Sequence, residues 1–320
     1  MASSAREDVA HEFLPFVRVY KDGTVERLID PPQVPPSLDD PHTGVSSKDV
    51  VLDPTIGVSA RIYLPPHTST AQKHPILLYF HGGGFCVGSA FSAADHSYMN
   101  SVSSQARVLA ISVEYRLVPK YPLPAAYEDG FSALRWVASH KSHGPDPWLA
   151  DYGNFDRIFI GGESAGGNIA HNVVMRAGRE ILPNGVKVTG LFLAMPYFWG
   201  PEPIGSEPKT GHESRVSSRI WDFVYPSCPD GLDSPHVNPF AHGAPSLATI
   251  GCRRVLVCLA GKDELRERGK MYVEALKESG FEGEVEEFEA EDEGHVFHIF
   301  NPHREAAKEM LQRLATFIQK

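Results

Sequence analysis

The sequence has few of the features that would place a protein on nucleic acid or in a membrane. Its formal net charge is −10, and it has no basic stripe that could neutralise phosphates, so nucleic acid is excluded as a partner. No apolar run approaches the ~20 residues that are needed to cross a bilayer, which argues against a membrane span. Residues 1–11 contain Arg6, Glu7 and Asp8 and no apolar signal segment, so we expect a cytoplasmic protein.

Cysteine is scarce, and the common metal and cofactor motifs are absent. The four cysteines show no C-x-x-C spacing, so we expect them to stay reduced, with Cys252 and Cys258 packed beside a strand. There is no H-E-x-x-H pair and no Cys/His cluster at ligand spacing, so no metal site is predicted. No G-x-G-x-x-G or Gly-Lys-Ser/Thr loop is present. We therefore predict no cofactor.

The composition and pattern of the chain are those of one α/β domain. Apolar residues make up 42% and charged residues 22%, which is enough for a sizeable core. An Asp-Gly turn predicts a hairpin within Phe13–Leu28, and a proline-rich strap follows at residues 30–36. Apolar strands then alternate with helices, which predicts a mostly parallel central sheet flanked by helices, with residues 1–320 as a single domain. The expected strands are Ser47–Leu52, Val58–Leu64, Pro75–Phe80, Val108–Tyr115, Arg157–Gly161, Val188–Met195, Arg254–Leu259 and Glu284–Phe288, and the expected helices are Ser89–Gln105, Tyr127–His140, Asn168–Arg176, Arg266–Ser279 and His303–Ile318.

Residues 197–245 interrupt this alternation. The segment is rich in proline, glycine and aromatic residues, with one short helical stretch near Ser214–Val224. Long insertions of this kind commonly cover an active site, so we predict a small cap built from this segment and from residues 1–45. Large aromatic side chains of the cap are expected to line an apolar substrate pocket, with ordinary core packing as the alternative. These residues are Phe198, Trp199, Trp221 and Phe223.

The sequence G-E-S-A-G at Gly162–Gly166 is typical of a nucleophile elbow. An apolar strand leads into it and a helix leads out, which is the setting that lifts a serine side chain above a sheet edge. The flanking glycines let neighbouring backbone pass close by, and the helix N-terminus points its partial positive charge at the reacting atoms. Ser164 is therefore the predicted nucleophile.

A glycine run, H-G-G-G-F at His81–Phe85, follows the expected strand Pro75–Phe80. Backbone N–H groups that no side chain obstructs are good donors to a developing oxyanion. We predict that the N–H groups of Gly83, Gly84 and Ala165 form this oxyanion hole. The alternative is a flexible turn, and the histidine that begins the run is expected to brace it.

In a fold with this elbow, the chain order Ser, Asp/Glu, His predicts where the other catalytic partners lie. Asp263 follows the strand Arg254–Leu259 and is the expected carboxylate that orients the histidine, with Glu264 as the rival. His295 follows the last expected strand and a glycine, and it is the expected general base, with His298 as the alternative.

Four motifs together resemble the hormone-sensitive-lipase-like branch of the α/β-hydrolase family. They are H-G-G-G at 81–84, Y-R-L at 115–117, P-A-A-Y-E-D at 124–129 and G-E-S-A-G-G-N at 162–168. The opening L-P-F-V-R-V-Y-K-D-G at 14–23 is similar to plant carboxylesterases of that branch. The resemblance covers nearly the whole chain and implies an α/β-hydrolase fold.

Within that branch the chain is especially similar to 2-hydroxyisoflavanone dehydratases. The similarity lies in Y-K-D-G at 20–23, T-G-V-S-S-K-D at 43–49 and A-P-S-L-A-T at 244–249. The legume dehydratases carry threonine where this chain has Ser164, so the serine departs from their pattern. Alkaloid cyclases share the scaffold. Gibberellin receptors share it too but have lost the catalytic histidine, so His295 argues against a receptor.

These observations predict a serine carboxylesterase that hydrolyses small to medium uncharged carboxylic esters through an acyl-enzyme. The alternative is a 2-hydroxyisoflavanone dehydratase-like lyase that uses the same site on a hydroxylated flavonoid. The expected partner in either case is a small-molecule substrate, either an ester or a flavonoid-like compound.

Overall fold

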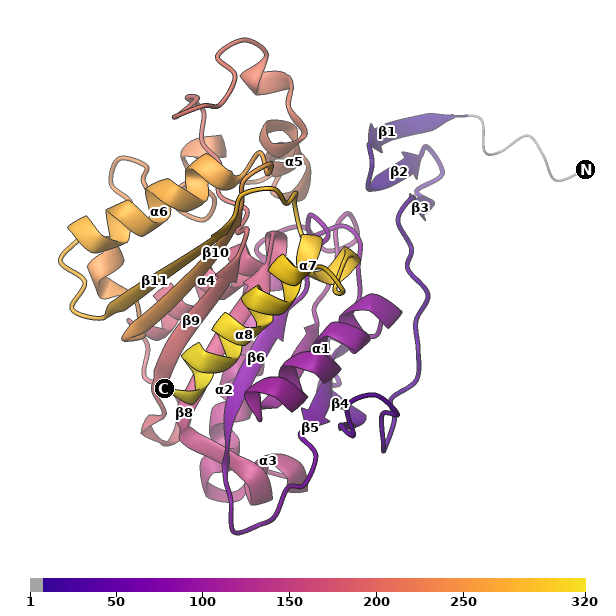
Figure 1. Ribbon diagram of the computed structural model, residues 1–320. Coiled ribbons are helices and arrows are strands. Elements are labelled where there is room, and N and C mark those ends of the chain that lie inside the picture. Colours follow the sequence, from indigo (N-terminus) through magenta and orange to yellow (C-terminus); the bar gives the residue numbers. More distant parts are fainter. Residues whose placement is uncertain (1–7) are drawn as a thin grey trace, which may run out of the picture.

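A computed structural model describes residues 8–320, and its centre is an eight-stranded sheet (Figure 1). The strand order is β11-β10-β9-β8-β6-β7-β5-β4. Strand β5 pairs antiparallel with both of its neighbours, and all other neighbouring pairs in this sheet are parallel. The strands are β4 (Ser46–Asp53), β5 (Val58–Leu64), β6 (His74–Phe80), β7 (Leu109–Glu114), β8 (Gly153–Glu163), β9 (Val188–Ala194), β10 (Arg254–Ala260) and β11 (Glu284–Ala290).

Helices cover both faces of the sheet, and alternate residues of each central strand pack against them. In β6, Leu77 and Tyr79 pack in a cluster with α1, α7 and α8, whereas Leu78 and Phe80 pack with α2, α4 and α6. A parallel strand buried on both faces reads as a continuous apolar run, as β6 does. The helices are α1 (Ala93–Ala106), α2 (Ala125–His143), α3 (Pro147–Tyr152), α4 (Ala165–Ala177), α5 (Val216–Val224), α6 (Arg266–Glu278), α7 (Phe297–Phe300) and α8 (Glu305–Gln319), and four 3-10 turns lie at Pro183–Gly185, His212–Ser214, Gly231–Asp233 and Leu247–Thr249.

The N-terminal arm forms a separate small sheet of β1 (Val9–Phe13), β2 (Val17–Tyr20) and β3 (Val25–Arg27). The arm meets residues 197–245 through the Phe13 ring, which stacks on the Phe223 ring of α5 with centroids 5.3 Å apart. The two segments that the sequence predicts as a cap are therefore in contact with each other.

The predicted alternation of parallel strands and helices is confirmed, with shifts at element ends. The helix expected from Ser89 begins instead at Ala93, because the Ser92 hydroxyl accepts a hydrogen bond from the Asp95 N–H at 3.1 Å and caps the helix. Strand β1 precedes the Asp-Gly hairpin of β2 and β3 and was not predicted from the sequence. Among residues 8–320, no helix is both long and apolar enough to cross a membrane.

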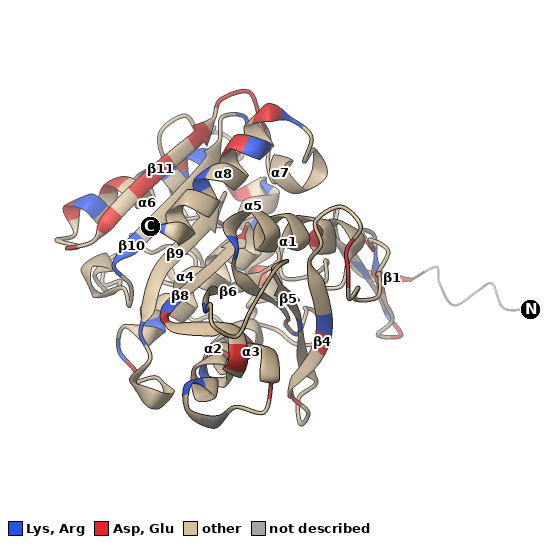
Figure 2. Cartoon of the chain, turned by 60° about the horizontal axis from the view of Figure 1, so that its bottom comes forward, with Lys and Arg blue, Asp and Glu red and all other residues tan. Residues whose placement is uncertain are grey.

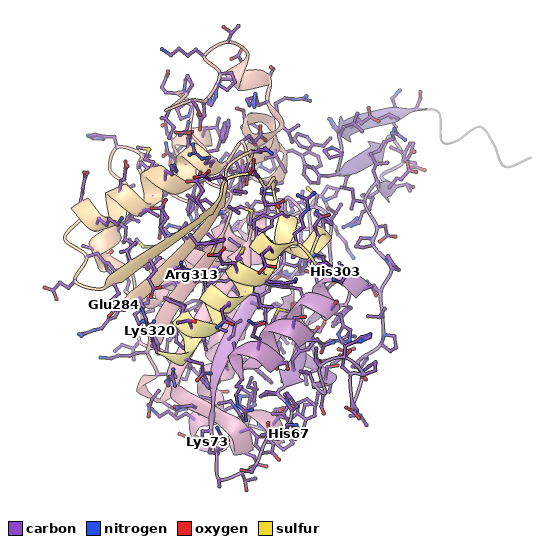
Figure 3. The ribbon with its side chains drawn as sticks, viewed as in Figure 1. His67, Lys73, Glu284, His303, Arg313 and Lys320 are labelled. Atoms are coloured by element: carbon purple, nitrogen blue, oxygen red, sulfur yellow. The ribbon has the colours of Figure 1, made fainter. Side chains whose placement is uncertain are left out.

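Strand β11 forms one of the two edges of the sheet, and it carries a row of carboxylates (Figure 2). Arg254 lies 3.5 Å from Glu284, and Lys320 donates to Glu286 at 2.8 Å. Figure 3 labels Glu284 and Lys320 beside β11. Charge on an edge strand hinders pairing with another sheet. No group of three or more His, Cys, Asp or Glu residues in the described part of the chain is placed to hold a metal ion.

Gly190 on β9 offers a test of the packing between sheet and helix α8. A Cβ at this position would lie 2.8 Å from Phe159 Cδ1 and 3.0 Å from Phe317 Cζ. Gly190→Ala should therefore overpack the core and lower the free energy of unfolding by about 1–3 kcal/mol, measured by urea denaturation. The double variant Gly190→Ala/Phe159→Leu should lose less than the sum of the two single variants, because the ring that the methyl group meets is gone. Simple additivity would contradict this explanation.

Candidate active site

Ser164 stands on the sharp turn between β8 and α4. Its backbone has φ of 53° and ψ of −120°, a conformation that is strained for a residue with a Cβ. The turn is possible because glycines stand two residues before and two residues after Ser164: a Cβ at Gly166 would lie 2.0 Å from the Phe80 carbonyl oxygen. Ser164 N–H donates to the Ala194 carbonyl at 3.0 Å, which ties the turn to the end of β9.

The structure brings the three predicted triad residues together at the carboxyl ends of β8, β10 and β11. His295 Nε2 lies 2.9 Å from Ser164 Oγ, and His295 Nδ1 lies 2.7 Å from Asp263 Oδ2. The second oxygen of Asp263 accepts the N–H of Leu265 at 3.0 Å, which fixes the plane of the carboxylate. The Asp263 side chain is 2% exposed and that of His295 is 39% exposed, so the imidazole is far more open to solvent than the carboxylate.

The two rival residues lie outside this chain of hydrogen bonds. Glu264 accepts from Arg215 Nε at 3.2 Å and from the Ser217 hydroxyl, so it is engaged with α5 and the residue before it. His298 is buried, and its ring packs edge-on against Tyr98 with centroids 5.0 Å apart.

The glycine loop after β6 is braced from two sides. The His81 ring stacks on Tyr115 with centroids 4.4 Å apart, and the Tyr115 hydroxyl donates to the His81 carbonyl at 2.8 Å. Gly82 N–H donates to the Glu163 carboxyl group. Within residues 8–320, the N–H groups of Gly83 and Gly84 donate to no protein acceptor, so both remain available to a ligand.

Glycine is required in this loop for steric reasons. Gly83 has φ of 102°, and a Cβ there would lie 2.1 Å from the Val87 carbonyl oxygen. Gly84 has φ of 59°, and a Cβ there would lie 2.7 Å from Ile220 Cδ1 of α5. The loop can therefore turn back on itself at Gly83 and lie close to α5 at Gly84 only because these two residues lack side chains.

Glu163, the residue before the nucleophile, is buried and joins the loop to the sheet. The Tyr79 hydroxyl donates to one of its oxygens and Gly82 N–H to the other. Burial raises the pKa of Glu163 well above its usual value, and nearby Asp95 raises it further. Glu163 is thus a structural brace for the loop, a role that its place inside the G-x-S-x-G motif did not suggest.

A cavity of about 570 Å³ opens over Ser164 and His295. One wall comes from the N-terminal arm, with Phe16 and Ile29, and another from α5, with Val216 and Ile220. The sequence analysis did not predict these four lining residues. For Val216 and Ile220 a signal was present: their i, i+4 spacing puts both side chains on one face of the helix. The remaining lining residues are Pro15, Pro31, His81, Gly82, Gly83, Gly84, Val87, Gly88, Ser92, Ala94, Asp95, Glu163, Tyr197, Ser217, Lys262, Asp263, Glu264, Leu265, Val296, Ile299 and Phe300.

The aromatic residues expected to line the pocket do not do so, which corrects that prediction. They are Phe198, Trp199, Trp221 and Phe223. Trp199 is fully buried and donates to the Ser218 hydroxyl at 2.7 Å, and Phe198 stacks on Tyr272 with centroids 4.9 Å apart. Trp221 follows Ile220 directly, so helix geometry turns its ring into the cap interior, where it donates to the Gly231 carbonyl at 2.7 Å.

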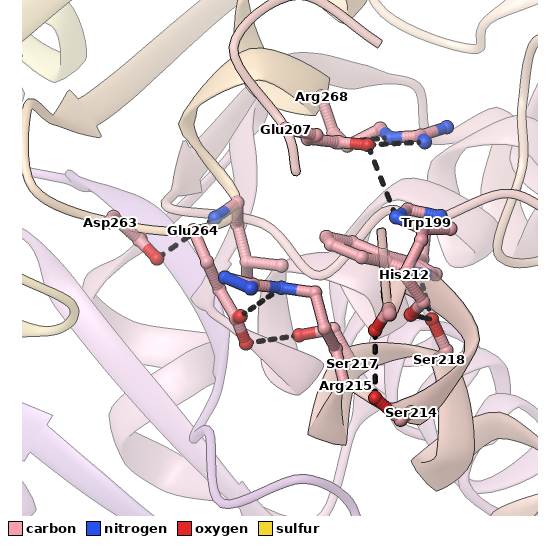
Figure 4. A network of polar contacts seen from close by, with 12 residues as sticks. Trp199, Glu207, His212, Ser214, Arg215, Ser217, Ser218, Asp263, Glu264 and Arg268 are labelled. Carbon is pink, nitrogen blue, oxygen red and sulfur yellow. Dashed lines mark hydrogen bonds and ion pairs between the residues drawn. The ribbon is translucent and has the colours of Figure 1, made fainter. Parts of the chain in front are cut away.

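Polar contacts join residues 197–245 to the loop that carries Asp263 (Figure 4). Glu264 is held by Arg215 and Ser217, as described above, and further back the buried Arg268 of α6 pairs with Glu207 at 2.7 Å. A buried pair of this kind is costly to break, because one charge would be left without its partner. The cavity wall formed by α5 and the loop that carries Asp263 are therefore held together by the contacts of Glu264.

Comparison with known proteins identifies the family. A family model described as an alpha/beta hydrolase fold matches residues 77–299. The chain belongs to the α/β-hydrolase family. The resemblance seen in the sequence motifs is thereby confirmed.

Both curated sequences and solved structures of this family are similar to the chain. A 2-hydroxyisoflavanone dehydratase of Glycyrrhiza echinata is 50% identical, covering 99% of this chain and 98% of its own. The probable carboxylesterase 2 of Arabidopsis thaliana is 44% identical, with 99% and 98% covered. A hyperthermophilic esterase from Pyrobaculum calidifontis superposes with a TM-score of 0.69 at 26% identity over 85% of this chain and 82% of that one.

Buried neutral histidines should make the protein sensitive to acid, and His298 allows a test. Burial lowers the pKa of His298 from 6.5 to about 3 in the folded protein. Since the folded pKa lies below the unfolded value, the stability is complete above pH 6.5 and is lost as pH falls toward 3. His298→Leu should reduce the pH slope of the unfolding free energy in this window by up to about 1.4 kcal/mol per pH unit, measured by urea denaturation. The exposed His303→Gln is the control and should follow the wild type; an unchanged slope in His298→Leu would contradict the prediction.

Proposed function

We propose that this protein is a serine carboxylesterase that hydrolyses small to medium uncharged carboxylic esters through an acyl-enzyme. The observation that carries the proposal is the continuous hydrogen-bonded chain from Ser164 Oγ to His295 Nε2 at 2.9 Å and from His295 Nδ1 to Asp263 Oδ2 at 2.7 Å. A hydroxyl group becomes a strong nucleophile when a base that is itself oriented by a carboxylate can take its proton.

In the proposed mechanism, His295 takes the proton of Ser164 as Oγ attacks the ester carbonyl carbon. The N–H groups of Gly83, Gly84 and Ala165 hold the oxygen on which negative charge develops. His295 then gives its proton to the departing alcohol, which leaves an acyl group on Ser164. Water attacks this acyl group with His295 as base, and the carboxylic acid leaves as Ser164 recovers its proton.

The cavity supports an uncharged, partly apolar substrate. Its volume of about 570 Å³ lies in the range of sites for small molecules, and the arm and α5 give it apolar walls. Acidic residues, including Asp263 and Glu264, also line it and disfavour a negatively charged substrate. We infer that the N-terminal arm and residues 197–245 act as the cap that excludes water from this site.

A lyase activity on the same site is the second candidate. The chain is 50% and 49% identical to proteins named 2-hydroxyisoflavanone dehydratase. In such a reaction, His295 or Ser164 would remove a proton from the carbon next to a carbonyl, and the hydroxyl group on the neighbouring carbon would take up that proton and leave as water. Ser164 favours hydrolysis, because the serine hydroxyl is held in position for attack by its bond to His295.

Substituting the nucleophile tests the esterase proposal. Ser164→Ala should lower kcat for 4-nitrophenyl acetate by about 10⁴–10⁶-fold, the loss that triad removal causes in serine proteases. An organophosphate probe should label the wild type at Ser164 and leave the variant unlabelled. Ordinary turnover by Ser164→Ala would end the proposal, provided that circular dichroism shows the variant to be folded.

The lyase candidate needs its own assay. Purified protein is incubated with 2-hydroxyisoflavanone, and isoflavone formation is followed by chromatography beside a His295→Gln control. Isoflavone formation above the uncatalysed rate that His295→Gln abolishes would support the lyase. Its absence, together with hydrolysis of activated esters, would leave the carboxylesterase alone.

A further inference from the structure

Four carboxyl groups line the cavity, and three of them have partners for both oxygens. Asp263 is bonded to His295 and to Leu265 N–H. Glu163 accepts from a tyrosine hydroxyl and from a loop N–H, and Glu264 from the arginine and serine of the α5 region. These carboxyl groups are therefore already engaged in holding the protein together.

The fourth carboxyl group, Asp95, differs from these three. It lies in the first turn of α1 and is 8% exposed. The Ser92 hydroxyl donates to Oδ2, which completes the cap of the helix, whereas the buried Oδ1 has no hydrogen-bond partner among the described residues. An unpaired buried carboxyl oxygen is costly, so a group that donates to it from the cavity would be bound favourably.

We propose that Asp95 is the polar recognition point of the substrate cavity and accepts a hydrogen bond from an alcohol or phenol hydroxyl of the substrate. The inference rests on the proposed esterase function and adds to it a class of substrate, hydroxylated uncharged esters. The terminal torsion of aspartate is broad, so the carboxyl group can turn toward the ligand without moving α1.

A hydroxyl group fits this position better than a charged group does. The cavity wall includes Val87, Val296 and Ile299, so an ammonium group at Asp95 would lose most of its hydration for a single acceptor. A carboxylate would be repelled by the Asp95 carboxylate, and it has no proton to donate to Oδ1. A hydroxyl group gives its one proton to Oδ1 at little desolvation cost.

The preference can be measured with matched esters on the wild type. The probes are 4-nitrophenyl esters whose acyl chains end in hydrogen, hydroxyl or ammonium, over a series of chain lengths. With the leaving group constant, kcat/KM should be about tenfold to a hundredfold higher for the hydroxyl than for the hydrogen compound at the length that reaches Asp95, as expected for a hydrogen bond to a charged acceptor. No hydroxyl preference at any length, or a stronger preference for ammonium, would overturn the inference.

Asp95→Asn identifies the residue responsible. Asparagine is nearly isosteric and can still accept from Ser92, but it presents an N–H donor where Oδ1 stood. The ratio of kcat/KM for the hydroxyl ester to that for the hydrogen ester should fall to about one. The kcat/KM of an ester whose acyl chain ends in a ketone should rise relative to that of the hydroxyl ester. The matched control is Asp292→Asn, since Asp292 is exposed and pairs with Lys262 at the rim; it should keep the wild-type ratio. A ratio unchanged in Asp95→Asn would refute the role of Asp95.

A binding measurement separates this inference from the esterase proposal. The amides that correspond to the esters are titrated calorimetrically into Ser164→Ala, which needs no turnover. Tighter binding of the hydroxyl amide, lost in Ser164→Ala/Asp95→Asn, supports the recognition point even if the wild type hydrolyses no ester. Equal binding of the hydroxyl and hydrogen amides contradicts it, even if hydrolysis is rapid.

Discussion

The backbone of the nucleophile turn lies against the end of β6 with no room for a side chain between them. A Cβ at Gly162 would lie 2.6 Å, and one at Gly166 2.0 Å, from the same Phe80 carbonyl oxygen. Phe80 ends β6, and the glycine loop starts with the next residue, so this contact fixes the nucleophile turn relative to that loop. The bond from Gly82 N–H to Glu163 depends on this closeness, and so does the presence of both segments in one cavity wall.

The sequence was sufficient to predict the elements and the residues at the ends of strands. Strand and helix periodicities are local, and Ser164, Asp263 and His295 each follow a strand of a parallel sheet, whose carboxyl ends share one edge. The cavity wall was not predictable in this way. Helix periodicity puts Ile220 and Trp221 on different faces of α5, but only the packing of α5 against the arm decides that the face with Ile220 meets the cavity.

Asp95 shows a different limit of local reasoning. In the sequence, an acidic residue three positions after a serine is fully explained as part of a helix cap, and the structure contains that cap. The cap uses only one of the two carboxyl oxygens. The position of the other oxygen beside the cavity follows only from the folded structure. The strands and loops that enclose the cavity are held by contacts between residues far apart in the chain.

Part of the cavity wall is supplied by Pro15, Phe16, Ile29 and Pro31, which precede every strand of the main sheet in the chain. Part of the shape presented to a ligand is thus encoded far from Ser164, Asp263 and His295 in the chain. Mutation or recombination in this leading stretch can therefore change the shape of the cavity and leave Ser164, Asp263 and His295 unchanged. After a gene duplication, the two copies can therefore come to differ in their cavities through changes in one short, early coding region.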